Sequence, residues 1–197
     1  MKTSARVVVI GGGVAGVATL YHLAKKGWTD VVLVERKELT SGSTWHAAGL
    51  LPLFNMSYSV GQIHKYSVDF YQRLEKETGH SVGFRQVSNI RLAMSQDRLD
   101  EYRYYAGVAR TIGVDVRLLS PAEVQAIWPL CQTDGLLGAI QHPDDGYIQP
   151  ADLTQALAAG ARSLGAEIYR HNAVTALAEL RGRGWSVRPR AGGLECG

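Results

Sequence analysis

The chain has 197 residues, which is enough for one domain and part of a second. With 46% hydrophobic and 20% charged residues, its composition is typical of a globular protein and excludes disordered, collagenous and coiled-coil classes. The formal net charge is +3, and the whole excess lies in residues 170–197, which carry five arginines and two acidic residues. Because these arginines are scattered, we expect no nucleic-acid partner and a solvated, unpaired tail.

No apolar run approaches the roughly 18 residues that a membrane-spanning helix needs, so we expect no membrane segment. Residues 1–5 lead directly into a strand pattern without a signal or transit peptide, which favours a cytoplasmic protein. The two cysteines, Cys131 and Cys196, have no His or Cys neighbours at ligand spacing. We therefore expect free thiols and no metal site.

The first 35 residues predict one βαβ unit. An apolar strand at 6–10, a glycine turn, a helix at about 14–26 and a second apolar strand at 31–35 follow one another. Both strands are continuous apolar runs, as in a parallel sheet that is covered on both faces.

Further elements are predicted along the rest of the chain. A helix at 60–78 carries Ile63, Tyr66, Phe70 and Leu74 on one expected buried face and ends at Gly79. Segments 83–87 and 90–94 resemble a hairpin, and Ser120 begins a capping box with Glu123. Predicted helices lie at 96–112, 121–128 and 151–164, and predicted strands at 116–119, 135–141, 167–169, 174–177 and 185–188. The last strands are expected to complete the sheet that begins at residue 6.

The turn between the first strand and the first helix carries a G-x-G-x-x-G motif. Gly11 permits a tight turn, Gly13 allows the backbone to approach a pyrophosphate, and Gly16 allows the helix to pack closely on the strand. The free N–H groups and the dipole of the helix would face the phosphates.

An acidic residue ends the second strand. Glu35 lies 19 residues after Gly16, where a carboxylate can accept hydrogen bonds from the ribose hydroxyls of a dinucleotide. Its charge would repel a 2′-phosphate, so the residues themselves favour FAD or NAD over NADP.

The segment that follows carries a family resemblance. Residues 41–50, Ser-Gly-Ser-Thr-Trp-His-Ala-Ala-Gly-Leu, resemble the flavin-contacting loop of the D-amino-acid-oxidase-like superfamily, and within it the dimethylglycine dehydrogenase and sarcosine dehydrogenase family. The similarity continues at 75–79, 90–93, 145–150 and 156–162, and it covers residues 6 to about 188. The resemblance implies that FAD is the cofactor.

His46 is the most specific residue of this loop. In the resembled family the matching histidine is bonded to the 8α carbon of the flavin, so the resemblance assigns this covalent bond to His46. Without the family, a histidine that caps a helix or binds the pyrophosphate is the better interpretation. The cofactor-binding residues predicted from the motif and the resemblance together are Gly11, Gly13, Val14, Ala15, Gly16, Glu35, Arg36, Gly42, Ser43, Thr44, Trp45, His46, Ala47, Ala48, Gly49, Leu50 and Val174. Val174 would offer its main chain to the adenine edge.

The resemblance also implies an activity, the oxidation of an N-methyl amine such as dimethylglycine or sarcosine by hydride transfer to the flavin. The alternatives are a non-catalytic flavin-binding or regulatory module, and another amine or amino-acid oxidase of the superfamily. Catalytic residues are expected beyond residue 197. Tetrahydrofolate is expected as a partner only if a C-terminal domain is supplied elsewhere, and association with a complementary chain is a further expectation.

The expected fold class is α/β. It consists of a Rossmann-like FAD-binding domain of the glutathione-reductase type with a parallel sheet, plus an inserted α+β part. We expect the dinucleotide-binding βαβ unit at 6–50, the insertion at about 83–148 and a return to the FAD sheet at about 151–197. In this interpretation the domain is incomplete at its C-terminal end.

Overall fold

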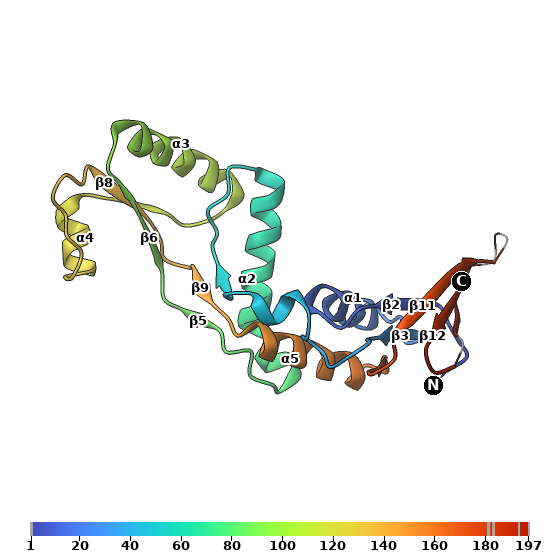
Figure 1. Cartoon of the computed structure of the whole chain (residues 1–197). Coiled ribbons are helices and arrows are strands. Elements are labelled where there is room, and N and C mark those ends of the chain that lie inside the picture. The colour runs from blue at the N-terminus through green and yellow to red at the C-terminus, as the bar shows by residue number, and fades with distance from the viewer. Residues whose placement is uncertain (1, 181, 183, 193, 197) are drawn as a thin grey trace. The chain divides into compact units, whose positions relative to one another are not determined.

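The computed structural model describes residues 2–180, 182, 184–192 and 194–196. Its helices are α1 (Val14–Lys25), the 3₁₀ helix η1 (Ser43–His46), α2 (Tyr58–Thr78), α3 (Gln96–Ile112), α4 (Pro121–Ile127) and α5 (Pro150–Ser163). Its strands are β1 (Ser4–Ala5), β2 (Val7–Ile10), β3 (Val31–Val34), β4 (Leu50–Leu51), β5 (Arg85–Gln86), β6 (Asn89–Ala93), β7 (Arg117–Leu119), β8 (Gly138–His142), β9 (Gly146–Tyr147), β10 (Glu167–Tyr169), β11 (Val174–Glu179), β12 (Trp185–Pro189) and β13 (Leu194–Cys196). Figure 1 labels most of them. Unit 1 comprises residues 1–49, 73–83 and 149–197, and unit 2 comprises residues 50–72 and 84–148.

Unit 1 contains the predicted βαβ arrangement. Strand β3 lies between β10 and β2 in a parallel sheet, with Val8 opposite Val32 and Ile168 opposite Leu33. All four residues of β3 are buried, as its continuous apolar sequence predicts. Helix α1 packs against β2 and β3, and α5 packs against α1 and β10 (Figure 1).

A glycine allows α5 to approach α1 closely. A Cβ atom at Gly160 would lie 2.6 Å from the ring of Tyr21 and 2.9 Å from the Cγ2 atom of Thr78. Substitution here would therefore push α5 away from Tyr21 of α1 and Thr78 of α2.

The C-terminal strands form a second sheet in unit 1, in the order β1-β13-β12-β11. Among the late strands that the structure describes, only β10 joins the sheet that begins near residue 6, so the expectation that these strands complete that sheet is wrong. The expectation of an unpaired tail is also wrong, because Val187 and Leu194 are buried in a core with Val32 and Val34. Arginine-rich composition did not prevent pairing, since Arg188 is exposed on the opposite face of the strand. Arg181 and Arg183 lie outside the described residues.

Unit 2 contains two small antiparallel sheets, β4-β9-β5 and β6-β8-β7. The predicted hairpin between residues 83–87 and 90–94 is wrong. Strand β5 pairs with β9, and β6 pairs with β8 with Asn89 opposite His142. The local turn signal was real, because Ser88 has a φ of 69°, but both partner strands lie far along the chain.

The predicted ends of the helices in unit 2 agree with the structure. Ser95 accepts a hydrogen bond from the Arg98 amide at the start of α3, and Gly113 ends that helix with a left-handed φ of 81°. The capping box of Ser120 and Glu123 is formed at the start of α4.

Helix α2 is less buried than its periodicity predicts. Phe70 and Leu74 are buried, but Ile63 and Tyr66 are 63% and 53% exposed. The prediction of one continuous buried face is therefore wrong for the N-terminal half of α2. No helix in the described part of the chain combines the length and apolar character needed to cross a bilayer.

Candidate functional site

The glycine turn between β2 and α1 has the conformation that its motif predicts. Gly11 has a φ of 110°, which disfavours any residue with a side chain, and its amide donates to the Val34 carbonyl at 2.9 Å. A Cβ atom at Gly16 would lie 2.0 Å from the carbonyl oxygen of Gly11. The predicted packing role of Gly16 is thus present, and it does not require contact with a ligand.

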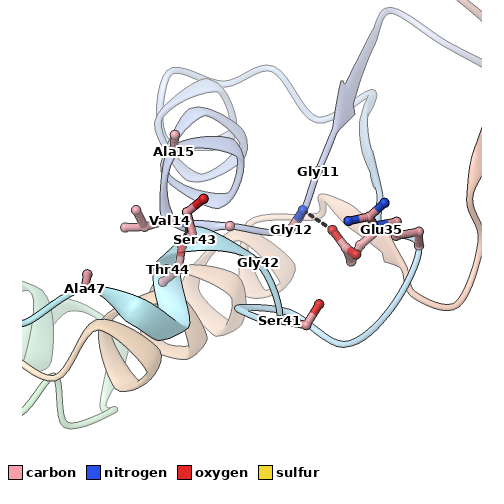
Figure 2. A pocket seen from close by; sticks show the side chains of 12 residues that line it. Gly11, Gly12, Val14, Ala15, Glu35, Ser41, Gly42, Ser43, Thr44 and Ala47 are labelled. Carbon is pink, nitrogen blue, oxygen red and sulfur yellow. Dashed lines mark hydrogen bonds between the residues drawn. The ribbon is translucent and has the colours of Figure 1, made fainter.

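Glu35 is tied to this turn. Its Oε2 atom accepts a hydrogen bond from the Gly12 amide at 2.6 Å, drawn in Figure 2, and its Oε1 atom accepts one from the Lys37 amide at 2.7 Å. Each carboxylate oxygen has a second lone pair, so the group retains acceptor capacity for hydroxyl donors. Sequence reasoning missed Gly12, where a Cβ atom would lie 2.6 Å from Leu39 and 2.9 Å from Glu35.

The loop after β3 is fixed to the glycine turn at two points. The Thr40 amide donates to the Gly12 carbonyl at 3.0 Å, and the Val14 amide donates to the Oγ1 atom of Thr44 at 2.9 Å. Thr44 is buried, and Figure 2 places it beside Val14 at the start of α1. One helix amide that was expected to face a phosphate is therefore occupied by Thr44.

A cavity of about 410 Å³ lies between the glycine turn and this loop (Figure 2). Of the predicted residues, those lining it are Gly11, Gly13, Val14, Ala15, Glu35, Arg36, Gly42, Ser43, Thr44 and Ala47. Two further lining residues, Gly12 and Ser41, were not predicted. The predicted residues absent from its lining are Gly16, Trp45, His46, Ala48, Gly49, Leu50 and Val174.

A second cavity of about 310 Å³ shares Gly11, Glu35 and Arg36 with the first. Its other lining residues are Ile10, Val34, Ala173 and Val174. The two cavities thus share lining residues at the end of β3. Val174 lies at the end predicted for adenine.

Asn172, which directly precedes Ala173 and Val174 of the smaller cavity, holds the chain next to Glu35 and was not indicated by the sequence. Its main-chain amide donates to the Glu35 carbonyl at 2.9 Å, and its buried side chain both accepts from and donates to the main chain of Ala191. A single Asn between strands carries no distinguishing pattern, so only the folded arrangement identifies it.

His46 is the last residue of η1 and is exposed, as are Trp45 and Ala47 before and after it. The structure brings the glycine turn, Glu35, residues 41–44 and Ala47 together at the larger cavity, and the cofactor contacts of these residues and of the other residues of 45–50 stay predictions.

Unit 2 holds two buried titratable side chains. Burial lowers the pKa of His142 to about 4, with a further lowering by the nearby Arg91 charge. Burial raises the pKa of Asp145 to about 6, although its Oδ1 atom accepts a hydrogen bond from the Leu53 amide at 2.8 Å. Val87 and Ser88 donate to the Asp145 main-chain carbonyl. The Asp145 side chain thus bonds a main-chain amide that is distant in the sequence rather than one in its own turn.

Known proteins match this chain in sequence and in fold. The family model described as FAD dependent oxidoreductase matches residues 6–196. Mitochondrial dimethylglycine dehydrogenase of Rattus norvegicus is 42% identical over 193 residues, covering 98% of this chain and 22% of that protein. Mitochondrial sarcosine dehydrogenase of Homo sapiens is 40% identical over 178 residues, covering 90% of this chain and 19% of that protein.

The crystal structure of L-proline dehydrogenase from P. horikoshii superposes with a TM-score of 0.92 at 25% identity, covering 100% of this chain and 52% of that one. The predicted fold class is confirmed by this match. The chain spans about a fifth of the length of the two curated relatives. The resemblance read from residues 41–50 is likewise confirmed, and the chain belongs to the family of FAD-dependent oxidoreductases that includes dimethylglycine dehydrogenase and sarcosine dehydrogenase.

Proposed function

We propose that this chain forms the FAD-binding part of an oxidoreductase that oxidises an N-methyl amine such as dimethylglycine or sarcosine. The observation that carries the proposal is the pair of adjoining cavities that share Gly11, Glu35 and Arg36. The larger cavity is lined by the glycine turn and by a hydroxyl-bearing loop, and these are the groups that a dinucleotide's phosphates require.

The residues present fit FAD. The main chain at Gly11–Gly13 lies against the larger cavity without side chains, which permits a pyrophosphate to approach the start of α1. Ser43 supplies a hydroxyl to the same cavity, and Glu35 supplies a carboxylate for ribose hydroxyls. Val174 would offer main-chain groups to adenine in the smaller cavity.

We further propose that His46 carries the flavin covalently. Support comes from its place in the Thr-Trp-His-Ala-Ala-Gly segment, which follows the cavity-lining residues 41–44 directly, and from its exposed position. An exposed imidazole is accessible to a ligand that leaves the cavity along residues 45–50. Only a ring with one unprotonated nitrogen can act as the nucleophile, because an imidazolium has no lone pair to give.

When bound, FAD would supply the two-electron oxidant, accepting a hydride from the N-methyl carbon. The substrate would leave as an iminium ion, which water converts to formaldehyde and the demethylated amine. This chain's residues would hold and orient the cofactor. Use of tetrahydrofolate stays a prediction that depends on a further domain.

The test is to purify the chain with FAD, remove oxygen, and add sarcosine or dimethylglycine. Loss of the oxidised flavin absorbance would support the proposal. A chain that binds FAD but is not bleached by any secondary or tertiary amine would contradict the assigned activity and favour the non-catalytic alternative. Glycine betaine, which has the same charges but no N–H, serves as a size-matched ligand for judging non-specific effects.

A further inference from the structure

Strand β8 and the turn after it place two titratable side chains in the interior of unit 2. His142 has no exposed surface, and Asp145 is 2% exposed. Both ring nitrogens of His142 and the Oδ2 atom of Asp145 have no hydrogen-bond partner among the described residues. Buried polar atoms are nearly always hydrogen-bonded, because a polar atom that leaves water without finding a new partner costs free energy. These three atoms therefore need a partner that the side chains around them do not provide.

Two more unpartnered atoms lie on the same face of the sheet. Asn89 of β6 is directly opposite His142 of β8, and Arg91 follows Asn89 by two residues in the same strand. Opposite residues of an antiparallel pair project to one face, as do residues two apart in a strand, so Asn89, Arg91 and His142 share a face. The Asn89 Oδ1 and Arg91 Nε atoms are buried and have no partner within the described part of the chain. Gln141 also has an unpartnered atom, but its side chain projects to the other face.

Ring contacts and main-chain bonds bring these side chains together. The ring centre of Phe54 lies 5.9 Å from that of His142, and the guanidinium carbon of Arg91 lies 4.4 Å from the same Phe54 ring centre. The Asp145 amide donates to the His142 carbonyl at 3.3 Å. Burial is the main cause of the shifted pKa values of His142 and Asp145, and the charge of Arg91 acts on both. We call this group of side chains the His142 cluster, and its members are Asn89, Arg91, His142 and Asp145.

The donors and acceptors of the His142 cluster determine which ligand it can hold. At neutral pH His142, with a pKa of about 4, is a neutral ring, and Asp145, with a pKa of about 6, is mainly a carboxylate. Three of the unpartnered atoms then accept hydrogen bonds, namely Asp145 Oδ2, Asn89 Oδ1 and one nitrogen of His142. The other two, Arg91 Nε and the second nitrogen of His142, donate.

This mixture excludes simple ions. The Asp145 carboxylate would repel an anion, and the Arg91 guanidinium would repel a cation. The described residues also contain no group of three His, Cys, Asp or Glu side chains that can hold a metal ion. The ligand must therefore be neutral, small, and both a donor and an acceptor.

Water has these properties, and the balance of its hydrogen bonds gives the number of molecules. One water molecule has two protons, which cannot serve three acceptors. Two water molecules that share one hydrogen bond keep three protons and three lone pairs, which is enough for all five atoms of the cluster. We propose that the His142 cluster binds a pair of linked water molecules, which belong to the folded structure of unit 2. This inference does not depend on the proposed function, because it concerns unit 2 without the cofactor.

The first experiment looks for the water in the full chain. Water-selective NOE spectra at neutral pH are recorded for the C–H protons of the His142 and Phe54 rings, which do not exchange with solvent. We expect cross-peaks with the sign given by water that tumbles with the protein. Because the nearby Tyr105 hydroxyl can relay magnetisation from water, Tyr105→Phe is measured as well, and its cross-peaks should persist. Absence of cross-peaks in the parent, or their loss in Tyr105→Phe, would overturn the inference.

Paired variants at residue 142 test which atoms hold the water. His142→Leu removes both nitrogens, whereas His142→Gln keeps one donor group and one acceptor group. Relaxation dispersion of ¹⁷O observes the water oxygen itself, so exchanging protons do not contribute. We expect the Leu variant to hold at least one long-lived water fewer than the parent and the Gln variant to keep the parent's number. Equal numbers in the parent and the Leu variant would contradict the proposal.

Ile140→Leu is the matched control, because Ile140 is buried on the same face but has no polar side-chain atom. It should keep the parent's number of long-lived waters. An equal loss in Ile140→Leu and His142→Leu would show that the water responds to packing and not to the ring nitrogens, which would contradict the assignment to His142.

Stability separates a hydrated cluster from a dry one. If the cluster is dry, His142→Leu removes two unsatisfied polar atoms and should leave the chain as stable as the parent or more stable. If the cluster is hydrated, the Leu variant deprives the water of partners, and we expect the equilibrium constant of unfolding to rise about tenfold at neutral pH. His142→Gln should raise it less. Urea unfolding measures all three chains, and a Leu variant at least as stable as the parent would overturn the inference.

Discussion

The hydroxyl oxygen of Thr44 lies 2.9 Å from the Val14 amide and accepts its hydrogen bond, so the loop after β3 caps the first turn of α1 from outside the helix. Gly13, which occupies the N-cap position of α1, has no side chain to do this. The loop and the helix start are therefore held together before any ligand arrives, at the wall of the larger cavity.

Replacing Thr44 by Val should leave the Val14 amide without its acceptor. We expect the free energy of unfolding to fall by about 1–2 kcal/mol and FAD affinity to fall with it, because a buried N–H would lose its partner. Thr44→Ser keeps the hydroxyl and should retain most of both properties. Urea unfolding and FAD titration of the two variants make the comparison, and a Val variant that retains the parent's stability while the Ser variant loses it would contradict the role of the hydroxyl.

Gly16→Ala tests the contact between α1 and β2. The new Cβ atom would lie 2.0 Å from the Gly11 carbonyl oxygen, so the helix start must shift and we expect a loss of at least about 2 kcal/mol in the free energy of unfolding. Gly107→Ala in α3 is the matched control, since that position is exposed and has nothing within 4 Å. The control should gain about 0.5–1 kcal/mol from helix propensity. A Gly16→Ala chain as stable as the parent would contradict the contact.

His46→Ala should abolish covalent flavin but retain part of the non-covalent affinity, because the glycine turn and Glu35 still line the cavities. Mass spectrometry of the acid-denatured chain measures the adduct on the peptide that contains residue 46. His80→Ala, which removes an exposed histidine after α2, should keep the adduct. If acid releases all the flavin from the parent chain, the covalent assignment is wrong.

Asp145 and His142 should have opposite effects on stability between about pH 4 and 6.5. The raised pKa of Asp145 makes its contribution largest below the ordinary pKa of 3.8, and that contribution is lost as pH rises through about 6. The lowered pKa of His142 makes its contribution complete above 6.5, and that contribution is lost as pH falls toward about 4.

Between these limits unfolding releases a proton from Asp145 and takes one up on His142, so the two effects nearly cancel. Asp145→Asn keeps an acceptor for the Leu53 amide but removes the proton release by residue 145 that offsets the proton uptake by His142. Relative to the parent chain, this variant should lose about 2 kcal/mol more between pH 7 and pH 4.5, measured by urea unfolding at both values. An unchanged difference between variant and parent at the two pH values would contradict the shifted pKa of Asp145.

Association of the chain is the last expectation to test. In the sheet β10-β3-β2, strand β2 pairs only with β3 among the described residues, and Ile10 at its end is 49% exposed. Unpaired strand edges promote contact with other chains, so we expect light scattering to increase with protein concentration. A dispersed monomer with a sharp cooperative melt would count against this.

The sequence predicted the features that depend on neighbouring residues. The β2-α1-β3 unit, the capping box at Ser120 and the end of the helix at residue 112 each arise from residues within one turn or strand. The glycine turn and Glu35 were predictable too, because both belong to the single β2-α1-β3 unit. In such a unit the carboxyl ends of the two parallel strands lie at the same edge of the sheet.

The failures concern partners that are distant in the chain. Strand β6 pairs with β8, with Asn89 opposite His142. A turn signal near residue 88 cannot reveal a partner strand that lies about 50 residues further along the chain. The exposed Ile63 and Tyr66 show that helical periodicity identifies an apolar face but not which part of it finds a partner. The contribution of Asn172 required knowledge of where Ala191 lies.

The hydrogen bonds between Asn172 and Ala191 hold one end of the β11–β12 hairpin, and the other end is held by a different bond. At the end near Glu35, the Asn172 side chain donates to the Ala191 carbonyl and accepts from the Ala191 amide, as the main chain of a neighbouring strand would. At the opposite end, the Leu180 amide donates to the Gly184 carbonyl. An insertion between residues 180 and 184 therefore falls outside the part of the hairpin that Asn172 holds. The hairpin tip is thus the place where this unit can accept an inserted tag or label while the walls of both cavities keep their spacing.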